Sequence, residues 1–207
     1  MLQHQRKEIK AMDKRNDITF DKRSDKYDEG FEGKLSERFY SNLVMAVEVK
    51  DGYRVLDVGC GTGTILKRIS NKAKIEGFGI DVSKPMLEEA KQKCPDMLFQ
   101  VGDCAALPFE DNSFDVVTAC MAYHHFPSQS GFRKEALRIL KPGGTLYICD
   151  PKFPNHIRKT MNGFFKISKT NARFYKPEEM KKDFEQSSFK FDKLIEDAYV
   201  QVLSMKK

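Results

Sequence analysis

The hydrophobic positions of this chain fall into short continuous runs that alternate with segments of helical spacing. The runs are rich in β-branched and aromatic residues, a composition typical of buried parallel strands. The alternation predicts a sheet of parallel strands with helices on both faces. The predicted strands occupy residues 55–58, 75–80, 97–101, 114–120 and 145–149.

The predicted helices are bounded by residues that favour helix ends. Ser83 is suited to cap a helix with Pro85 in its first turn, and Pro142 with the two following glycines ends another. Apolar spacing of three and four residues places helices at 35–49, 65–71, 132–140 and 155–169, after Ser83, and from Pro177 onward.

Two more hydrophobic runs, at residues 189–195 and 199–203, lie near the end of the chain. Only three residues separate them, and a parallel crossover needs a dozen or more, so we predict an antiparallel pair. The fold class is therefore predicted as α/β, a doubly wound, Rossmann-like, three-layer sandwich with an antiparallel edge strand. Residues 51–207 would form this domain. Residues 1–50 are predicted to be a helical or lid segment of it, with a charged surface helix as the alternative.

Composition and charge narrow the setting of the protein. The 207-residue chain has no run of eighteen apolar residues and no apolar N-terminal stretch, so neither a membrane span nor a signal peptide is predicted. Its five cysteines lack metal-binding spacing, which favours reduced thiols in a cytoplasmic protein. Residues 152–207 hold 13 Lys/Arg and 7 Asp/Glu and so account for the net charge of +6. This basic end fits an anionic substrate or nucleic acid, or a solvated lysine-rich surface.

A glycine-rich turn, Gly59-Cys60-Gly61-Thr62-Gly63, joins the first strand to the next helix. Glycines in such a turn let backbone amides approach a ligand closely. Asp81 ends the second strand and Asp103 follows the third, and the carboxyl ends of parallel strands line one crevice. We therefore predict that Asp81 binds ribose hydroxyls and Asp103 an adenine amine, with Met86 and Leu107 beside the base. For each acid taken alone, the alternative is a surface cap of the following helix.

The spacing of the glycines distinguishes between adenosine cofactors. The dinucleotide fingerprint is G-x-G-x-x-G, and it binds a pyrophosphate. In this chain the third glycine comes one residue earlier, and Asp57 lies two residues before the first. A carboxylate is unfavourable beside a pyrophosphate but suits a ligand with an ammonium group and no phosphate.

These motifs resemble those of class I S-adenosylmethionine-dependent methyltransferases, especially the small-molecule branch with the ubiquinone and menaquinone C-methyltransferases. The likeness covers roughly residues 53–150. It rests on Val55-Leu56-Asp57-Val58-Gly59-Cys60-Gly61-Thr62-Gly63, Gly79-Ile80-Asp81, Gly102-Asp103-Cys104, Ser113-Phe114-Asp115, His124-His125-Phe126 and residues 138–144. The resemblance implies a seven-stranded sheet, S-adenosylmethionine as cofactor, and in-line transfer of its methyl group to a small-molecule acceptor.

The resemblance also implies a role in cofactor binding for individual residues. Gly59 and Gly61 would approach the methionine part, with Asp57 toward its ammonium group. Asp81 would hold the ribose. In the same way, Val82 and Met86 would flank adenine, Asp103 and Cys104 would read its edge, Cys120 would lie near the methionine part, and Tyr27 would close over it.

His124 and His125 follow the fourth strand and are candidates for removing a proton from the acceptor. His125 is the candidate catalytic residue, and a packing or lid-positioning role is the alternative for both histidines. Cys60, Cys104 and Cys120 fall at the same crevice. Small thiols that fill tight space are favoured there over a redox or metal site, so no metal is predicted.

The same residues also distinguish between other functions and acceptors. A protein that binds S-adenosylmethionine without catalysis would share these motifs. A nicotinamide-dependent oxidoreductase is disfavoured by the glycine spacing and by Asp57. The segment Ala119-Cys120-Met121-Ala122-Tyr123 lacks the Asn/Asp-Pro-Pro-aromatic set of methylases that act on base amines, so a nucleic-acid acceptor is disfavoured. The sequence does not indicate an oligomeric state.

Overall fold

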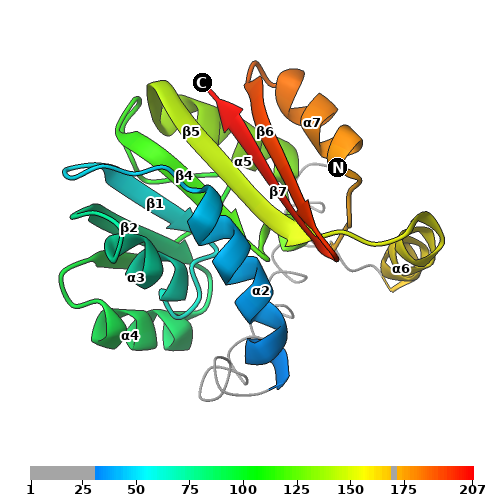
Figure 1. Cartoon of the computed structure of the whole chain (residues 1–207), viewed down its shortest axis with the longest axis horizontal. Coiled ribbons are helices and arrows are strands. Elements are labelled where there is room, and N and C mark those ends of the chain that lie inside the picture. Colours follow the sequence, from blue (N-terminus) through cyan, green and yellow to red (C-terminus); the bar gives the residue numbers. More distant parts are fainter. Residues whose placement is uncertain (1–30, 169–171) are drawn as a thin grey trace, which may run out of the picture.

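Each predicted strand is present in one sheet in the computed structural model, which describes residues 31–168 and 172–207, with side chains from residue 36 onward. Within that part of the chain the sheet has seven strands in the order β3-β2-β1-β4-β5-β7-β6 (Figure 1). The strands are β1 Arg54–Val58, β2 Glu76–Asp81, β3 Leu98–Val101, β4 Phe114–Cys120, β5 Leu140–Pro151, β6 Lys190–Asp197 and β7 Val200–Lys206.

The predicted α/β fold with a mostly parallel sheet is confirmed. Strands β1 to β5 pair in parallel, and β7 is antiparallel to both of its neighbours, β5 and β6. The antiparallel strand is second from the edge, and β6 is outermost. Only Ala198 and Tyr199 separate β6 from β7, which leaves no room for a crossover.

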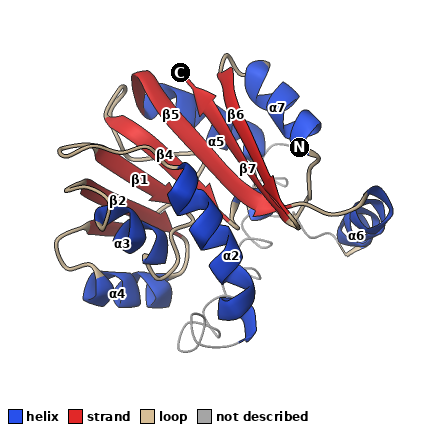
Figure 2. Cartoon of the chain, in the orientation of Figure 1, coloured by secondary structure: helices blue, strands red, loops and turns tan. Residues whose placement is uncertain are grey.

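Helices cover both faces of the sheet and so form the three predicted layers (Figure 2). One hydrophobic core joins the sheet to residues of α2, α3 and α4, and a second joins it to residues of α5 and α7. The helices are α2 Phe31–Ala46, α3 Thr64–Ser70, α4 Lys84–Lys93, α5 Gln129–Ile139, α6 Asn155–Ile167 and α7 Pro177–Glu185, with a 3₁₀ turn η2 at Tyr123–His125. No helix of the described residues is both long and apolar enough to span a bilayer.

Several boundaries differ from the sequence prediction, and two of the differences have a clear physical cause. Helix α5 begins at Gln129, three residues earlier than predicted, because the Ser128 hydroxyl caps it by accepting from the Gly131 N–H at 3.1 Å. Strand β5 begins at Leu140, where the sequence predicts a turn. The Gly143 and Gly144 backbone is held in the sheet by hydrogen bonds with Lys207 at the end of the chain.

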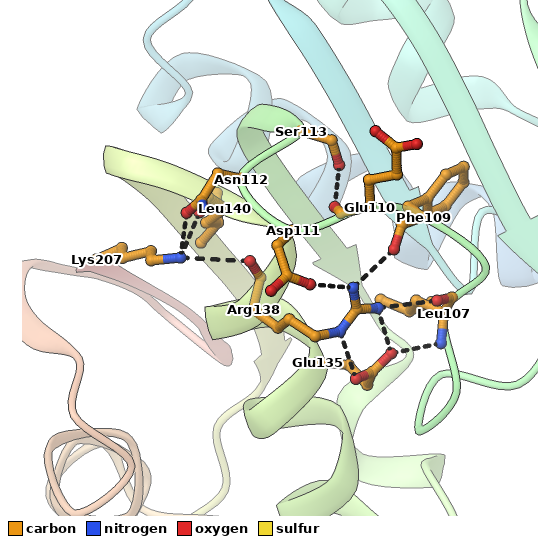
Figure 3. A network of polar contacts seen from close by, with 10 residues as sticks. All are labelled: Leu107, Phe109, Glu110, Asp111, Asn112, Ser113, Glu135, Arg138, Leu140 and Lys207. Atoms are coloured by element: carbon orange, nitrogen blue, oxygen red, sulfur yellow. Dashed lines mark hydrogen bonds and ion pairs between the residues drawn. The ribbon is translucent and has the colours of Figure 1, made fainter.

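A polar network fixes the loop between β3 and β4 onto α5 (Figure 3). The Arg138 guanidinium donates to the carbonyls of Leu107 and Phe109 and pairs with the carboxylates of Glu135 and Asp111, at 2.7–3.0 Å. Glu135 in turn accepts from the Leu107 N–H at 2.8 Å. This loop follows directly on Asp103, so the network holds one wall of the region where a ligand is predicted to bind.

Candidate functional site

The main cleft of the described structure lies where β1, β2 and β4 end. Parallel strands bring these carboxyl ends together at one edge of the sheet, the usual ligand position in such folds. The cleft has a volume of about 150 Å³. Ten of the predicted site residues line it: Asp57, Gly59, Gly61, Asp81, Val82, Met86, Asp103, Cys104, Cys120 and His125. Leu107, predicted beside the base, is instead buried in the hydrophobic core and does not line the cleft. Tyr27 lies outside the described residues.

The glycine-rich turn has the backbone conformation that only glycine adopts without strain. Gly59, Gly61 and Gly63 have φ values of +74°, +50° and +76°. A Cβ at Gly59 would lie 2.5 Å from the Ala122 Cβ, so the turn and the segment after β4 approach too closely for a side chain. The Gly59 N–H donates to the Ile80 carbonyl at 2.7 Å, which ties the turn to the end of β2.

Asp57 is buried beneath this turn. Its Oδ1 accepts a hydrogen bond from the Thr118 hydroxyl of β4 at 2.6 Å. Burial raises the pKa of the Asp57 carboxyl to about 7. The hydrogen bond from Thr118 lowers this pKa in part, and the negative charge of Asp81 raises it slightly. A cation in the cleft would favour the ionised form, so the site is electrostatically suited to a ligand that carries an ammonium group.

The raised pKa of Asp57 predicts an unusual pH dependence for the ligand-free protein. The contribution of Asp57 to the stability of the folded state is fully present below about pH 4 and is lost as the pH rises through about 7, because the folded state favours the protonated acid. Asp57→Asn does not titrate. We expect the free energy of unfolding of the variant, relative to wild type, to rise by about 2–3 kcal/mol from pH 5 to pH 8.

Urea unfolding of both proteins at the two pH values measures this difference. The same substitution is expected to weaken binding of a cationic ligand, since it removes the negative charge. A difference in stability that is equal at pH 5 and pH 8 would show that Asp57 is ionised throughout, contrary to this prediction.

Asp81 is held in position by the backbone on both sides of the cleft. Its Oδ2 accepts from the Gly61 N–H at 2.8 Å, and its Oδ1 accepts from the Ser83 N–H at 2.9 Å. The carboxylate therefore couples the glycine turn to the start of α4. Next to it, Val82 is exposed and Met86 is buried, so apolar surface adjoins the acid.

Asp103 lies in an exposed turn and lines the cleft together with the buried Cys104. The Asp103 Oδ1 accepts from the Ala105 N–H at 2.8 Å, which is the local turn-stabilising role that the sequence left open. Lining the cleft and stabilising the turn are compatible, because the second carboxylate oxygen takes no part in this hydrogen bond.

The two adjacent histidines occupy different environments. His124 is buried away from the cleft, where its Nδ1 lies 3.0 Å from the Asp150 Oδ1 and its ring stacks on Phe174. His125 lines the cleft. Burial, with a smaller contribution from His124, lowers the pKa of His125 to about 3, so its ring is neutral at physiological pH.

The five cysteines are all buried and free. Burial raises the pKa of both Cys60 and Cys120, which leaves these thiols protonated and poorly reactive. Across the described residues no group of three or more His, Cys, Asp or Glu is placed to hold a metal ion.

The structure adds cleft residues that sequence reasoning missed. Tyr40 comes from α2, and no motif in the sequence connects that helix to the site. Met121 has a strained φ of +52° at the end of β4, and its N–H donates to the Cys149 carbonyl at 2.7 Å. Phe126 and Pro127 follow η2 and extend the wall beside His125. Proximity to the predicted histidines was the available signal for the last two.

Comparison with known proteins finds a related domain. The family described as "Methyltransferase domain" matches residues 56–148, the segment with all the cleft motifs from Asp57 to His125. These residues are thus similar to those of S-adenosylmethionine-dependent methyltransferases. S-adenosylmethionine is the cofactor that this similarity supports.

Individual relatives support the assignment. The chain is 36% identical over 150 residues to the demethylmenaquinone methyltransferase of Renibacterium salmoninarum, covering 70% of this chain and 63% of that protein. It is 34% identical to the enzyme of the same name from Thermotoga maritima, covering 68% and 63%. The chain thus spans just under two thirds of the length of these relatives. A solved methyltransferase from Thermotoga maritima has the same fold, with a TM-score of 0.69, 22% identity, and 91% and 98% coverage.

The residues of the cleft fit the cofactor of the family. The side-chain-free turn at Gly59 and Gly61 leaves backbone close to the cleft, and Asp57 supplies negative charge beneath it. Asp81 presents a fixed carboxylate beside the apolar surface of Val82 and Met86. A carboxylate for an ammonium group, a second for ribose hydroxyls and an apolar slot for a base are the chemical parts that S-adenosylmethionine requires.

Proposed function

We propose that this chain transfers the methyl group of S-adenosylmethionine to a small-molecule acceptor. One observation carries the proposal: a single cleft joins the glycine turn, the two fixed acids Asp57 and Asp81, and an apolar extension along residues 125–127. A Cβ at Gly59 would lie 3.6 Å from the Phe126 ring, so the extension adjoins the glycine turn, which we assign to the methionine part. It therefore supplies room for an acceptor near the group to be transferred.

The individual assignments follow from position in the cleft. We assign Asp57, Gly59, Gly61 and Cys120 to the methionine part, and Asp81 to the ribose. Val82, Met86, Asp103 and Cys104 are assigned to adenine, because Val82 and Met86 add apolar surface next to Asp81, and Asp103 and Cys104 follow the neighbouring strand β3. S-adenosylmethionine supplies an activated sulfonium methyl, so the main tasks of the protein are to align the acceptor and to exclude water.

The acceptor side of the cleft is predominantly apolar. Tyr40, Met121, Phe126 and Pro127 line it together with His125. This lining favours an acceptor with an apolar or aromatic body over a polynucleotide phosphate backbone. Demethylmenaquinone methyltransferases are among the relatives, and a quinol-like acceptor is compatible with these walls. The position of Tyr40 also supports a role for residues 1–50 in covering the cleft, and Tyr27 is proposed to take part.

We propose that His125 orients the acceptor as a neutral hydrogen-bond acceptor. A pKa of about 3 makes the ring a weak general base, since proton transfer is most efficient when the pKa lies near the working pH. The neutral Nδ1 or Nε2 still accepts a hydrogen bond from an acceptor hydroxyl. We therefore expect that titration of His125 causes no change in the rate of methyl transfer between pH 5 and pH 9, which a pH–rate profile measures.

The buried free cysteines support a reducing compartment, and we place the protein in the cytoplasm on that basis. A protein that only binds S-adenosylmethionine would not need the apolar extension at residues 125–127. A nicotinamide-dependent oxidoreductase would have to place a pyrophosphate near the buried carboxylate of Asp57, which is electrostatically unfavourable.

The decisive experiment is transfer of an isotopically labelled methyl group. Incubation of the protein with labelled S-adenosylmethionine and a fractionated extract should yield S-adenosylhomocysteine and one labelled small molecule. His125→Phe should lower kcat by about tenfold or more while leaving cofactor affinity unchanged, and His125→Gln should restore part of the rate. Cofactor binding without turnover in any fraction would favour the binding-only function instead.

A further inference from the structure

Helix α6 has an apolar face that the rest of the described chain leaves uncovered. Ile157, Phe164 and Ile167 are 40%, 65% and 83% exposed. At 100° per residue these three side chains fall within about 80° of the helix circumference, so they form one stripe. The helix stands beside the sheet rather than on it, as Figure 1 shows at the right of the molecule.

The sequence segment that holds this helix carries charge of one sign, and two of its basic residues, Lys152 and Arg158, pair with acids outside the segment. Residues 151–177 contain seven Lys/Arg and no Asp/Glu. The other 180 residues contain 29 Lys/Arg and 30 Asp/Glu, so the positive charge of the protein is concentrated in this segment. Lys159 and Lys166 lie on the side of α6 opposite the apolar stripe, which makes the helix amphipathic.

The inner side of α6 is fixed to the body of the protein. The Asn162 side chain exchanges two hydrogen bonds with the Phe174 backbone, both at 2.9 Å. Arg158 pairs with Glu179 of α7 at 3.2 Å, and the Phe165 ring lies 5.7 Å from that of Phe174. The helix is therefore held in place by other residues, and the exposed stripe has no part in that attachment.

The attachment also connects α6 to the cleft. Phe174 stacks on His124, and the Arg173 N–H donates to the His124 carbonyl at 2.8 Å. His125, the next residue, lines the cleft. A surface that binds the exposed stripe of α6 would thus lie on the same edge of the sheet as the opening for the acceptor.

We propose that α6 docks this protein on the surface of an anionic lipid bilayer. An interfacial helix needs apolar side chains on one face, Lys or Arg on the other, and low net hydrophobicity, and α6 meets each condition. Phe164, Ile167 and Ile157 would enter the boundary of the acyl chains. The basic residues of 151–177 would attract anionic headgroups, which an acid in the segment would oppose. This docking does not depend on methyl transfer.

A protein partner fits these observations less well. A complementary protein surface would have to combine an apolar groove for the stripe with acidic groups placed around it for the basic residues. A bilayer provides both features along its whole surface. The exposed residues of β3, Leu98 at 67% and Val101 at 56%, are comparably apolar but lack the concentration of positive charge. They therefore provide a matched control.

Sedimentation with lipid vesicles tests the proposal on the full chain without cofactor. Wild type should bind vesicles with about one third phosphatidylglycerol at least about tenfold more strongly than pure phosphatidylcholine vesicles, and less at high salt. Phe164→Ser with Ile167→Ser, and separately Lys159→Glu with Lys166→Glu, should each reduce binding by about tenfold. Leu98→Ser with Val101→Ser should leave it unchanged.

A fluorescent reporter gives a second measurement, because the chain contains no tryptophan. Phe164→Trp should show a blue-shifted emission with anionic vesicles, and Leu98→Trp should not. Circular dichroism and thermal unfolding verify that each variant is folded. The proposal is wrong if the wild-type protein does not bind anionic vesicles, or if the α6 and β3 variants lose vesicle binding equally. It is also wrong if size-exclusion chromatography shows that the α6 stripe instead mediates self-association.

Discussion

Replacing Asp81 by alanine is expected to lower the affinity for S-adenosylmethionine by at least about a hundredfold. Hydrogen bonds to a charged group contribute about 1.5–3 kcal/mol each, and the proposed ribose contact has two of them. The carboxylate also accepts from the Gly61 and Ser83 N–H groups, so its loss loosens the glycine turn and the start of α4 together. Isothermal titration calorimetry with the cofactor measures the change.

Two further variants separate the causes. Asp96→Ala removes an equal charge from an exposed position outside the cleft and should leave the affinity unchanged. Asp81→Asn keeps one acceptor oxygen and should fall between wild type and alanine. If Asp81→Ala binds the cofactor as tightly as wild type, the ribose assignment is wrong.

Replacing Gly59 by alanine is expected to destabilise the protein by about 3 kcal/mol and to abolish cofactor binding. A left-handed φ costs a non-glycine residue about 1–2 kcal/mol, and forced overpacking adds about 1–3 kcal/mol. Here φ is +74°, and the new Cβ would lie 2.5 Å from the Ala122 Cβ. Because the turn forms the floor of the cleft, relief of this clash displaces the backbone that faces the ligand. Denaturant unfolding and calorimetry measure the two effects.

The chain offers a matched control for the backbone strain. Gly52 has a φ of +81°, and a Cβ there would meet nothing within 4 Å. Gly52→Ala should therefore cost only about 1 kcal/mol, the conformational part of the effect. Adding Ala122→Gly to Gly59→Ala removes the other side of the clash and should restore part of the stability. Equal losses for Gly52→Ala and Gly59→Ala would mean that packing against Ala122 has no importance.

The site combines features that are unfavourable for folding but useful for binding. Asp57 is an acid buried with one hydroxyl donor, and Met121 has a left-handed backbone at the end of β4. Such features cost of order 1–3 kcal/mol each and persist where the surrounding structure enforces them. Both lie in the cleft, whereas the three other non-glycine residues with a left-handed φ, Asn112, Ser188 and Ala198, lie in turns outside it. The buried carboxyl of Asp57 is therefore the more specific of the two features.

Much of the fold and of the cofactor side of the cleft was predictable from the sequence because the signals are local. Continuous β-branched runs mark strands buried on both faces, and three residues between two runs exclude a parallel crossover. The glycine spacing and the acids at strand ends follow from the same local pattern. Once strands are parallel, their carboxyl ends must meet at one edge, so Asp57, Asp81 and Asp103 converge without further information.

The acceptor side was decided by tertiary contacts alone. His124 and His125 are adjacent in the sequence, yet Asp150 of β5 and Phe174 bury the first, which leaves the second in the cleft. Tyr40 arrives from a helix that no motif connects with the site. The pKa of Asp57 depends on burial beneath the assembled sheet. Each of these properties depends on contacts between groups that are distant in the chain, and local residue spacing does not determine such contacts. The cofactor motifs, by contrast, consist of consecutive residues.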